Sequence, residues 1–139
     1  MDCIPLGGRI IMFLVSKKME VAYAHNLKLP YNSKCLNLHG HNGWITTFCK
    51  AKELDPETGM VIDFTILKKL VQDKFDHAYI NDLLPSINPT AEKMAEWICN
   101  EINNTQFEDG RFSTCICYRV DFQESDGNIA SYIWDEEAI

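Results

Sequence analysis

Apolar and polar residues alternate along two long stretches in the first half of the chain, and this pattern predicts two β-strands. The first runs from Ile10 to about His25, and the second runs from His41 to Leu54. Alternation places every second side chain on the same face of a sheet, which leaves one face for the core. The turn-forming run 55–59, Asp-Pro-Glu-Thr-Gly, ends the second strand. We expect the two strands to pair as a hairpin.

The middle of the chain changes to a helical period. Asp63 is expected to cap a first helix, whose apolar positions follow at three- and four-residue spacing as far as Phe75. A loop is expected over residues 81–89. Pro89 or Thr90 then begins a second helix, whose apolar face ends near residue 102. Each helix is therefore predicted to bury one face.

The last third of the chain returns to strand-like alternation. Residues 112–122 and 129–134 predict two strands joined by a tight turn over Ser125–Asn128. The element order is then β-β-α-α-β-β, which predicts an α+β domain with an antiparallel sheet and two helices on one face. We expect one domain over residues 1–139, with residues 1–11 as a candidate N-terminal extension. A four-stranded sheet has two open edges, so we also expect an oligomer.

Composition narrows the classes of partner. The 139 residues are 46% hydrophobic and carry a formal net charge of −7. The chain can therefore bury a core but lacks the basic field that nucleic acids and anionic membranes attract. The apolar run 10–15 is too short to span a membrane and lacks the flanks of a signal peptide. We expect a cytoplasmic protein that binds a small molecule, with no nucleic-acid or membrane partner.

The cysteines do not have the pattern of a disulfide scaffold. Cys49, Cys99, Cys115 and Cys117 fall inside apolar periodic segments, so we expect buried thiols. Cys115 and Cys117 are two residues apart in a predicted strand and should point to one face. Cys35 stands apart from these four, in a polar loop.

Three histidines are candidate metal ligands. His39 and His41 flank Gly40 at the start of a predicted strand, so their side chains share a face. His25 ends the preceding strand, which would lie beside them in a hairpin. Three neutral imidazoles with one open position form a catalytic zinc site, whereas Cys35 as a fourth ligand would give a closed structural site. Strand histidines that bind no metal remain the competing interpretation.

Cys35 and the pair Asp76-His77 are candidate catalytic residues. Cys35 follows Lys34 near the expected metal and could act as a general acid, base or nucleophile. A fourth zinc ligand and an unreactive surface thiol are the alternatives for this cysteine. Asp76 could orient the imidazole of His77 and keep it basic. A histidine at a helix C-terminus, favoured by the helix dipole, is the alternative for this pair.

Two carboxylates are candidates for binding a substrate. Glu92 and Glu124 have largely apolar or turn-forming neighbours in the sequence. A carboxylate can accept two hydrogen bonds from an amidine-like edge, such as that of a pterin. The alternatives are an acid in the first helical turn for Glu92 and a solvated residue before a turn for Glu124.

Taken in order, these segments resemble one family. The order and spacing of the motifs, over about Met19 to Trp134, are similar to the 6-pyruvoyltetrahydropterin synthase / 6-carboxytetrahydropterin synthase family. Each motif alone is weak, but the ordered set is specific. Phe75 stands where the family usually has Leu, and Ser125 where Thr is usual. The motifs are Ala24-His25, Cys35 to Asn42, Asp55 to Phe64, Leu67-Lys68, Asp76 to Asn81, Asn88 to Glu92, and Glu124-Ser125.

The resemblance implies a fold and a set of site residues. It implies the tunnelling fold, a β-β-α-α-β-β unit whose trimers close a barrel and stack in pairs as a homohexamer. The residues that match the family's zinc ligands are His25, His39 and His41. Those that match its catalytic residues are Cys35 as proton acceptor, Asp76 and His77 as triad partners across a subunit boundary, and Glu124. Those that match its pterin contacts are Thr90, Glu92 and again Glu124.

The resemblance also implies a lyase that eliminates triphosphate from 7,8-dihydroneopterin triphosphate. In the 6-carboxy branch, a carbon–carbon cleavage then releases acetaldehyde, and the product feeds 7-deazaguanine and queuosine synthesis. Three residues separate Cys35 from His39, as in the bacterial 6-carboxy enzymes, whereas the animal 6-pyruvoyl enzymes carry a longer insert. The run Asp126–Ile129 is closer to the 6-pyruvoyl branch, which is the alternative.

Two other classes remain as hypotheses. A catalytically silent, zinc-stabilised pterin-binding module would carry the same histidines. An epimerase or aldolase of the same fold, acting on dihydroneopterin, is a further option. The three-histidine pattern disfavours the metal-free members of that last group.

Overall fold

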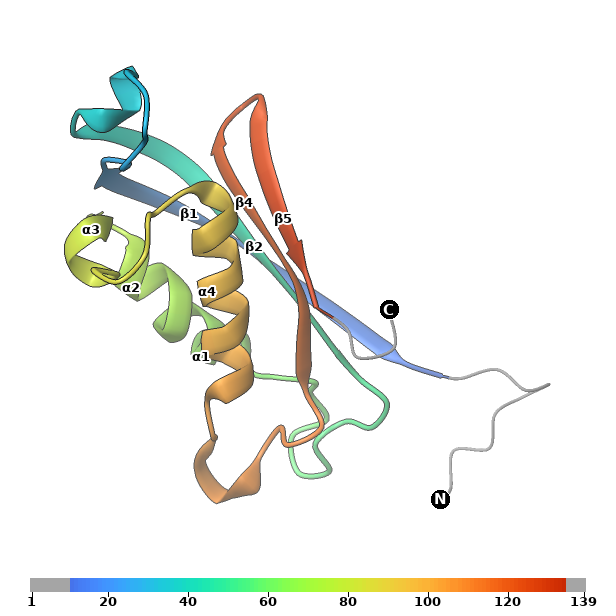
Figure 1. The fold of residues 1–139 in the computed structure, drawn as a ribbon. Coiled ribbons are helices and arrows are strands. Elements are labelled where there is room, and N and C mark those ends of the chain that lie inside the picture. The colour runs from blue at the N-terminus through green and yellow to red at the C-terminus, as the bar shows by residue number, and fades with distance from the viewer. Residues whose placement is uncertain (1–10, 135–139) are drawn as a thin grey trace.

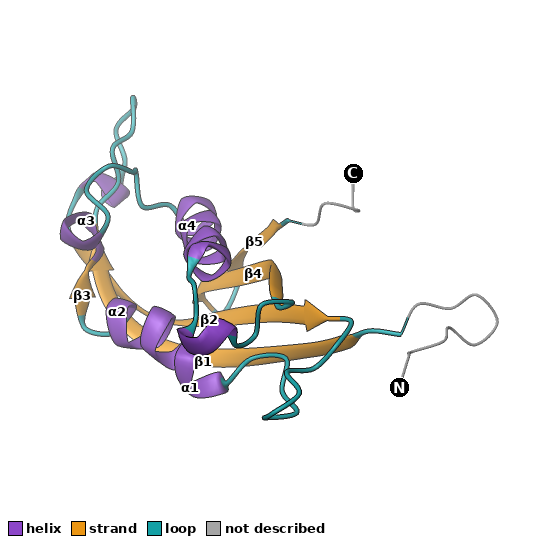
Figure 2. Ribbon diagram, turned by 90° about the horizontal axis from the view of Figure 1, so that it is seen from below, coloured by secondary structure: helices purple, strands orange, loops and turns teal. Residues whose placement is uncertain are grey.

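The computed structural model describes residues 11–134 and consists of a five-stranded sheet with helices on one face (Figures 1 and 2). The order of strands across the sheet is β3-β1-β2-β4-β5. The α+β architecture predicted from the element order is confirmed. The strands are β1 (Phe13–His25), β2 (His39–Ala51), β3 (Ala78–Tyr79), β4 (Ile116–Ser125) and β5 (Asn128–Ile133).

The helical segments are short except for α4. None in the described part of the chain is long and apolar enough to cross a membrane. The helical segments are η2 (Lys34–Leu36), α1 (Phe64–Leu67), η3 (Lys68–Gln72), α2 (Asp73–Phe75), α3 (Ile80–Leu83), α4 (Ala91–Asn104) and η4 (Glu108–Gly110).

Strands β1 and β2 form the expected hairpin, in continuous antiparallel register from Phe13↔Ala51 to His25↔His39. Both predicted boundaries of the second strand were wrong, because the strand extends only where β1 provides a partner. It therefore begins at His39 and ends at Ala51. The predicted start of the first strand at Ile10, most of the candidate extension, and Cys3 lie outside the described residues.

Strands β4 and β5 form a second hairpin. Strand β4 joins this hairpin to the first by pairing antiparallel with β2. Gly43 permits the close approach of these strands, because a Cβ atom there would lie 2.4 Å from the carbonyl oxygen of Gln123. Farther along, a β-bulge falls between Phe48 and Cys49. Such a bulge shifts which side chains face the core. The tight turn predicted after Ser125 is confirmed, since Ser125 pairs with Asn128.

The sheet has one strand more than the sequence predicted. Strand β3 pairs in parallel with β1 through Tyr23↔Ala78 and Ala24↔Tyr79. Two residues are too few for alternation to be visible in a sequence, so the expectation of a purely antiparallel four-stranded sheet was wrong. Helix α3 likewise occupies the start of the segment predicted as a loop.

The two predicted helices are present on one face of the sheet, but only the second is regular. The Asp63 side chain caps α1 by accepting from the Thr65 N–H at 2.8 Å, as predicted. The first helix then passes through the π-helical turn η3 before α2. Helix α4 begins after Thr90, whose hydroxyl accepts from the Lys93 N–H. Its apolar stripe packs into the core, with Met94, Ala95, Ile98, Cys99 and Ile102 buried.

Candidate metal centre

Three histidines meet at one end of the sheet. His25 is the last residue of β1 and His39 the first of β2, and the two are register partners. His41 lies two residues along β2 on the same face. One ring nitrogen from each histidine lies within 4.8 Å of the others, and the ring centroids are 4.6–5.2 Å apart. The sequence predicted this grouping, because a hairpin register places a strand's end beside its partner's start.

Backbone carbonyls orient two of the rings. His25 Nδ1 lies 2.8 Å from the Pro89 carbonyl oxygen, and His39 Nδ1 lies 2.7 Å from that of Asn37. A carbonyl can only accept, so each Nδ1 carries the hydrogen and each Nε2 keeps a lone pair. Carbonyls that hold ring N–H groups in this way are typical of metal-binding histidines.

The donor set fits a metal ion such as zinc. His41 Nε2 is buried and has no hydrogen-bond partner. A buried unpaired nitrogen is costly, and a metal bond would satisfy it. Burial lowers the pKa of His25 to about 4, and the nearby rings of His39 and His41 add to this effect, while the hydrogen bond to Pro89 opposes it. His25 is therefore neutral at neutral pH, the form that binds metals.

Glu124 lies beside the histidines at the end of β4. Its Oε1 is 3.7 Å from His25 Nε2, and 22% of its side chain is exposed. Within residues 11–134, the converging ligand atoms come from the three histidines alone. Neither Glu124 nor Cys35 completes a closed four-ligand site in this arrangement. A coordination position therefore remains for a substrate or a water molecule.

Tyr23 belongs to the same site, although sequence reasoning missed it. Its ring centroid lies 5.3 Å from that of His25 and 5.4 Å from that of His41. Its hydroxyl is buried and has no hydrogen-bond partner. Burial, and to a lesser extent the charge of Glu124, raise the pKa of Tyr23, so the hydroxyl keeps its hydrogen. The available signal was its position two residues before His25, on the same face of the strand.

Asp76 and His77 form a contacting pair on the outer side of β1. Asp76 Oδ2 lies 3.0 Å from His77 Nδ1. The Ala22 N–H donates to Asp76 Oδ1 at 2.8 Å, and the His77 N–H donates to the Ala22 carbonyl at 2.6 Å. The Ala22 N–H is the main reason that the pKa of Asp76 is lowered, with His77 contributing less. The His77 side chain is 84% exposed and its φ is +60°, a constrained backbone conformation.

Cys35 lies in the 3₁₀ turn η2, in the connection between β1 and β2. The Ser33 hydroxyl accepts from the Cys35 N–H at 3.1 Å, and the Cys35 carbonyl accepts from the Leu27 N–H at 2.8 Å. These bonds hold the turn near the histidine end of the hairpin, and the Cys35 side chain is partly buried. The loop therefore presents a free thiol from a fixed turn.

The residues just before α4 have two roles, since one contacts the metal centre and the next caps the helix. The carbonyl of Pro89 orients His25, whereas the hydroxyl of Thr90 caps α4. Glu92 is exposed in the first turn of the helix. The structure thus gives Thr90 and Glu92 helix-terminal positions, and their contact with a substrate remains a prediction.

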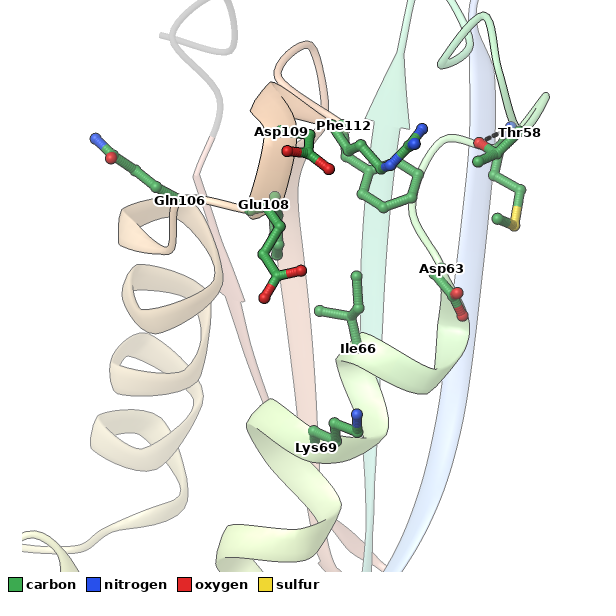
Figure 3. Close-up of a pocket in the computed structure, with 11 residues that line it drawn as sticks. Thr58, Asp63, Ile66, Lys69, Gln106, Glu108, Asp109 and Phe112 are labelled. Carbon is green, nitrogen blue, oxygen red and sulfur yellow. Dashed lines mark hydrogen bonds between the residues drawn. The ribbon is translucent and has the colours of Figure 1, made fainter.

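A separate cavity of about 600 Å³ opens at the other end of the sheet (Figure 3). It lies between α1 and the η4 segment, where Ile66 and Glu108 face one another. None of the predicted site residues lines it. The chemistry-bearing residues are instead grouped at the opposite end, where β1 ends and β2 begins (Figure 1).

The fold and the centre together define the class of protein: an α+β domain with a three-histidine candidate metal centre at one end of its sheet. Residues 14–134 match the family model described as 6-pyruvoyl tetrahydropterin synthase. The chain therefore belongs to this family of tetrahydropterin synthases.

Curated relatives carry two names within the family. The 6-carboxy-5,6,7,8-tetrahydropterin synthase of Synechocystis is 37% identical over 63% of this chain and 72% of its own length. That of Rickettsia bellii is 31% identical over 73% of this chain and 88% of its own length. The human 6-pyruvoyl tetrahydrobiopterin synthase is 27% identical over 91% of this chain and 94% of its own length.

Solved structures share the fold. The 6-pyruvoyl tetrahydropterin synthase of Caenorhabditis elegans superimposes with a TM-score of 0.68 at 24% identity, over 91% of this chain and 99% of that one. The Plasmodium vivax enzyme has a TM-score of 0.63 at 16% identity, over 88% of this chain and 97% of that one. The tunnelling fold inferred from the motifs is thereby confirmed.

Proposed function

We propose that this chain is a zinc-dependent 6-carboxytetrahydropterin synthase. It converts 7,8-dihydroneopterin triphosphate into 6-carboxytetrahydropterin, with release of acetaldehyde and triphosphate, as a lyase in 7-deazaguanine and queuosine synthesis. The observation that carries the proposal is the convergence of three histidine nitrogens within 4.8 Å, in a group to which no other side chain of residues 11–134 adds a ligand atom. His25, His39 and His41 would hold the zinc ion.

Zinc bound there supplies a Lewis acid for hydroxyl and carbonyl oxygens of the substrate side chain. The protein supplies the proton transfers. The Cys35 thiolate accepts a proton from the substrate side chain, and His77 exchanges protons with its oxygens. Asp76 holds the His77 imidazole in place through the 3.0 Å contact.

Glu124 would anchor the substrate ring beside the metal. Its carboxylate lies 3.7 Å from the His25 ring and can accept hydrogen bonds from the amidine-like edge of a pterin. Thr90 and Glu92 are weaker candidates for the same role, because Thr90 already caps α4 and Glu92 is exposed. The unpartnered Tyr23 hydroxyl is a further donor within this site.

The exposure of His77 favours a site shared between subunits. Its imidazole is 84% exposed beside β3, the edge strand of the sheet. A neighbouring chain added at that edge would cover it and could receive it in its own site. We therefore propose the homohexamer, a dimer of trimers, as the functional form.

The 6-carboxy branch is preferred over the 6-pyruvoyl branch on two grounds. The Synechocystis and Rickettsia relatives with the 6-carboxy name are more similar in sequence than the human 6-pyruvoyl enzyme is. The short spacing of Cys35 and His39 agrees with this preference. The 6-pyruvoyl activity remains the second candidate, since the human relative matches more of the chain.

The test is incubation of the zinc-loaded protein with 7,8-dihydroneopterin triphosphate, with separate detection of acetaldehyde and of the pterin product. We expect acetaldehyde and 6-carboxytetrahydropterin in equal amounts. A 6-pyruvoyl product without acetaldehyde would select the second candidate. No turnover by a zinc-loaded protein that binds the pterin would instead support the silent binding module. The Cys35→Ala variant is the matched control for background chemistry.

A further inference from the structure

Four cysteines from three elements meet in the core, at the end of β2 and β4 away from the histidines. They are Cys49 in β2, Cys99 in α4, Cys117 in β4, and Cys115 directly before β4. Cys49, Cys99 and Cys117 are buried, whereas Cys115 is partly exposed. All four are free thiols, and the proposed reaction uses none of them.

The thiols form a line of contacts. Cys49 is the register partner of Cys117 across β2 and β4, and Cys115 lies two residues before Cys117. Cys99 reaches this pair from α4, because its Sγ donates to the Cys117 carbonyl at 3.3 Å. The four cysteines therefore lie in a row and do not surround one point, as the ligands of a metal ion would. The group of potential metal ligands that converges in the described residues contains no cysteine, so thiol–disulfide chemistry is favoured over metal binding.

Cys49 and Cys117 have the backbone geometry of a disulfide pair. They are direct register partners of the antiparallel strands β2 and β4. Such partners have Cα atoms about 4.5–5.5 Å apart, within the range of about 4.4–6.8 Å that disulfides occupy. Cys115 is a diagonal neighbour of Cys49, a longer separation that suits a transient bond better than a stable one.

The environment of Cys117 makes it the better attacking group. The neighbouring Cys49 thiol is the main reason that the pKa of Cys117 is lowered, whereas the pKa of Cys49 is raised. The Cys117 backbone is also fixed by Asn103, whose side chain bonds to both its N–H and its carbonyl at 2.8 Å. The thiolate is the reactive form in disulfide exchange.

We propose that Cys49 and Cys117 form a reversible disulfide between β2 and β4, and that a small disulfide oxidant reaches this pair through Cys115. In the first step, the Cys115 thiolate attacks oxidised glutathione, whose S–S bond breaks to release one glutathione. The Cys49 thiol then attacks the Cys115 sulfur, and its proton passes to the second glutathione, which leaves as the thiol. The Cys117 thiolate finally attacks the Cys49 sulfur and regenerates the Cys115 thiolate.

The exchange balances without another reactant. Each step breaks one S–S bond and forms one. The two electrons lost by the Cys49 and Cys117 thiols reduce one glutathione disulfide to two glutathione thiols, which also take up the two protons. Cys49 lies near the last residue of β2, whereas His39 and His41 lie at its start, so the metal centre should keep its zinc.

The experiment treats the reduced full-length protein with oxidised glutathione and follows it by intact mass and by peptide mapping without reduction. We expect loss of two hydrogen atoms, a Cys49–Cys117 linked peptide and unchanged zinc content. Thiols that stay reduced, a glutathione adduct that persists on Cys115, or a final Cys49–Cys115 link would overturn the proposal.

Variants separate the roles of the four thiols. Cys117→Ala should abolish the final bond, and Cys115→Ala should slow its formation at least about tenfold, because the buried pair then lacks its accessible neighbour. Cys99→Ala is the matched control, equally buried but outside the exchange, and should change the rate less than about twofold. Equal rates for Cys115→Ala and Cys99→Ala would contradict the path through Cys115. Melting curves identify any variant that fails to fold, and the peptide map of the unsubstituted protein tests the bond independently.

Discussion

The imidazole of His39 and the thiol of Cys35 should differ in their effect on zinc. His39 contributes one of the three converging nitrogens, whereas the Cys35 thiol lies outside that group. We expect His39→Ala to lose bound zinc, and Cys35→Ala to keep it while turnover falls by about 10²–10⁴-fold, the usual contribution of a general acid or base. Metal analysis and product formation measure the two effects. Loss of zinc from Cys35→Ala would point instead to a closed site with four protein ligands.

Burial of neutral His25 predicts an acid-sensitive metal-free protein. The pKa of His25 is lowered to about 4 by burial in the folded state, against about 6.5 in an unfolded chain. The unfolded state therefore binds the proton more tightly. Stability is complete above about pH 6.5 and falls by up to about 3 kcal/mol as the pH drops to about 4.

Urea unfolding of the chelated protein across this pH range measures that loss. His77→Gln is the comparison variant, because the His77 side chain is 84% exposed and lies outside the three converging histidines; the loss of stability toward pH 4 should persist in it. A free energy of unfolding that stays level between about pH 6.5 and pH 4 would contradict the role assigned to His25.

The pairing of β2 with β4 places Glu124 beside the histidines. It depends on Gly43, where an added Cβ would lie 2.4 Å from the Gln123 carbonyl oxygen. We expect Gly43→Ala to destabilise the protein by about 1–3 kcal/mol, as overpacking does, and to weaken pterin binding by moving Glu124. Gly127→Ala is the control, since nothing lies within 4 Å of its added Cβ.

Denaturant unfolding measures the stability of both glycine variants, and titration with a pterin measures binding. If Gly43→Ala matched Gly127→Ala in both measurements, the close strand approach would have no part in placing Glu124.

The edges of the sheet determine how whole molecules associate. Strands β3 and β5 are the two edges, and β5 carries the exposed side chains of Ile129 (59%) and Ile133 (62%). Unpaired edges of this kind favour pairing with another chain. We expect a particle of about six times the 16.0 kDa chain mass in light scattering after gel filtration.

A charge on the β5 edge should reduce this association. Ile133→Lys is expected to shift the protein to smaller species and to lower turnover, if His77 acts across the subunit boundary. Ser86→Lys places the same charge on an exposed loop before α4 and is the control. A monomeric unsubstituted protein with full turnover would rule out the shared site.

Local patterns were sufficient to predict much of the molecule. Alternation identified β1 and β2, helical spacing after Pro89 and Thr90 identified α4, and Ser125–Asn128 identified the last turn. The histidines could be grouped in advance, because a hairpin brings the end of one strand to the start of the next. Each of these features depends on residues close together in the sequence or on one short connection.

Features that depend on long-range packing could only be known from the tertiary structure. Strand β3 has two residues and exists because β1 offers an edge beside it. The contact of Cys49 with Cys117 depends on the register of β2 against β4, and the position of Glu124 depends on the same register. The unpartnered hydroxyl of Tyr23 depends on every group packed around it. The sequence by itself therefore determined which side chains are available for chemistry, whereas the packing of distant segments decided which of them meet.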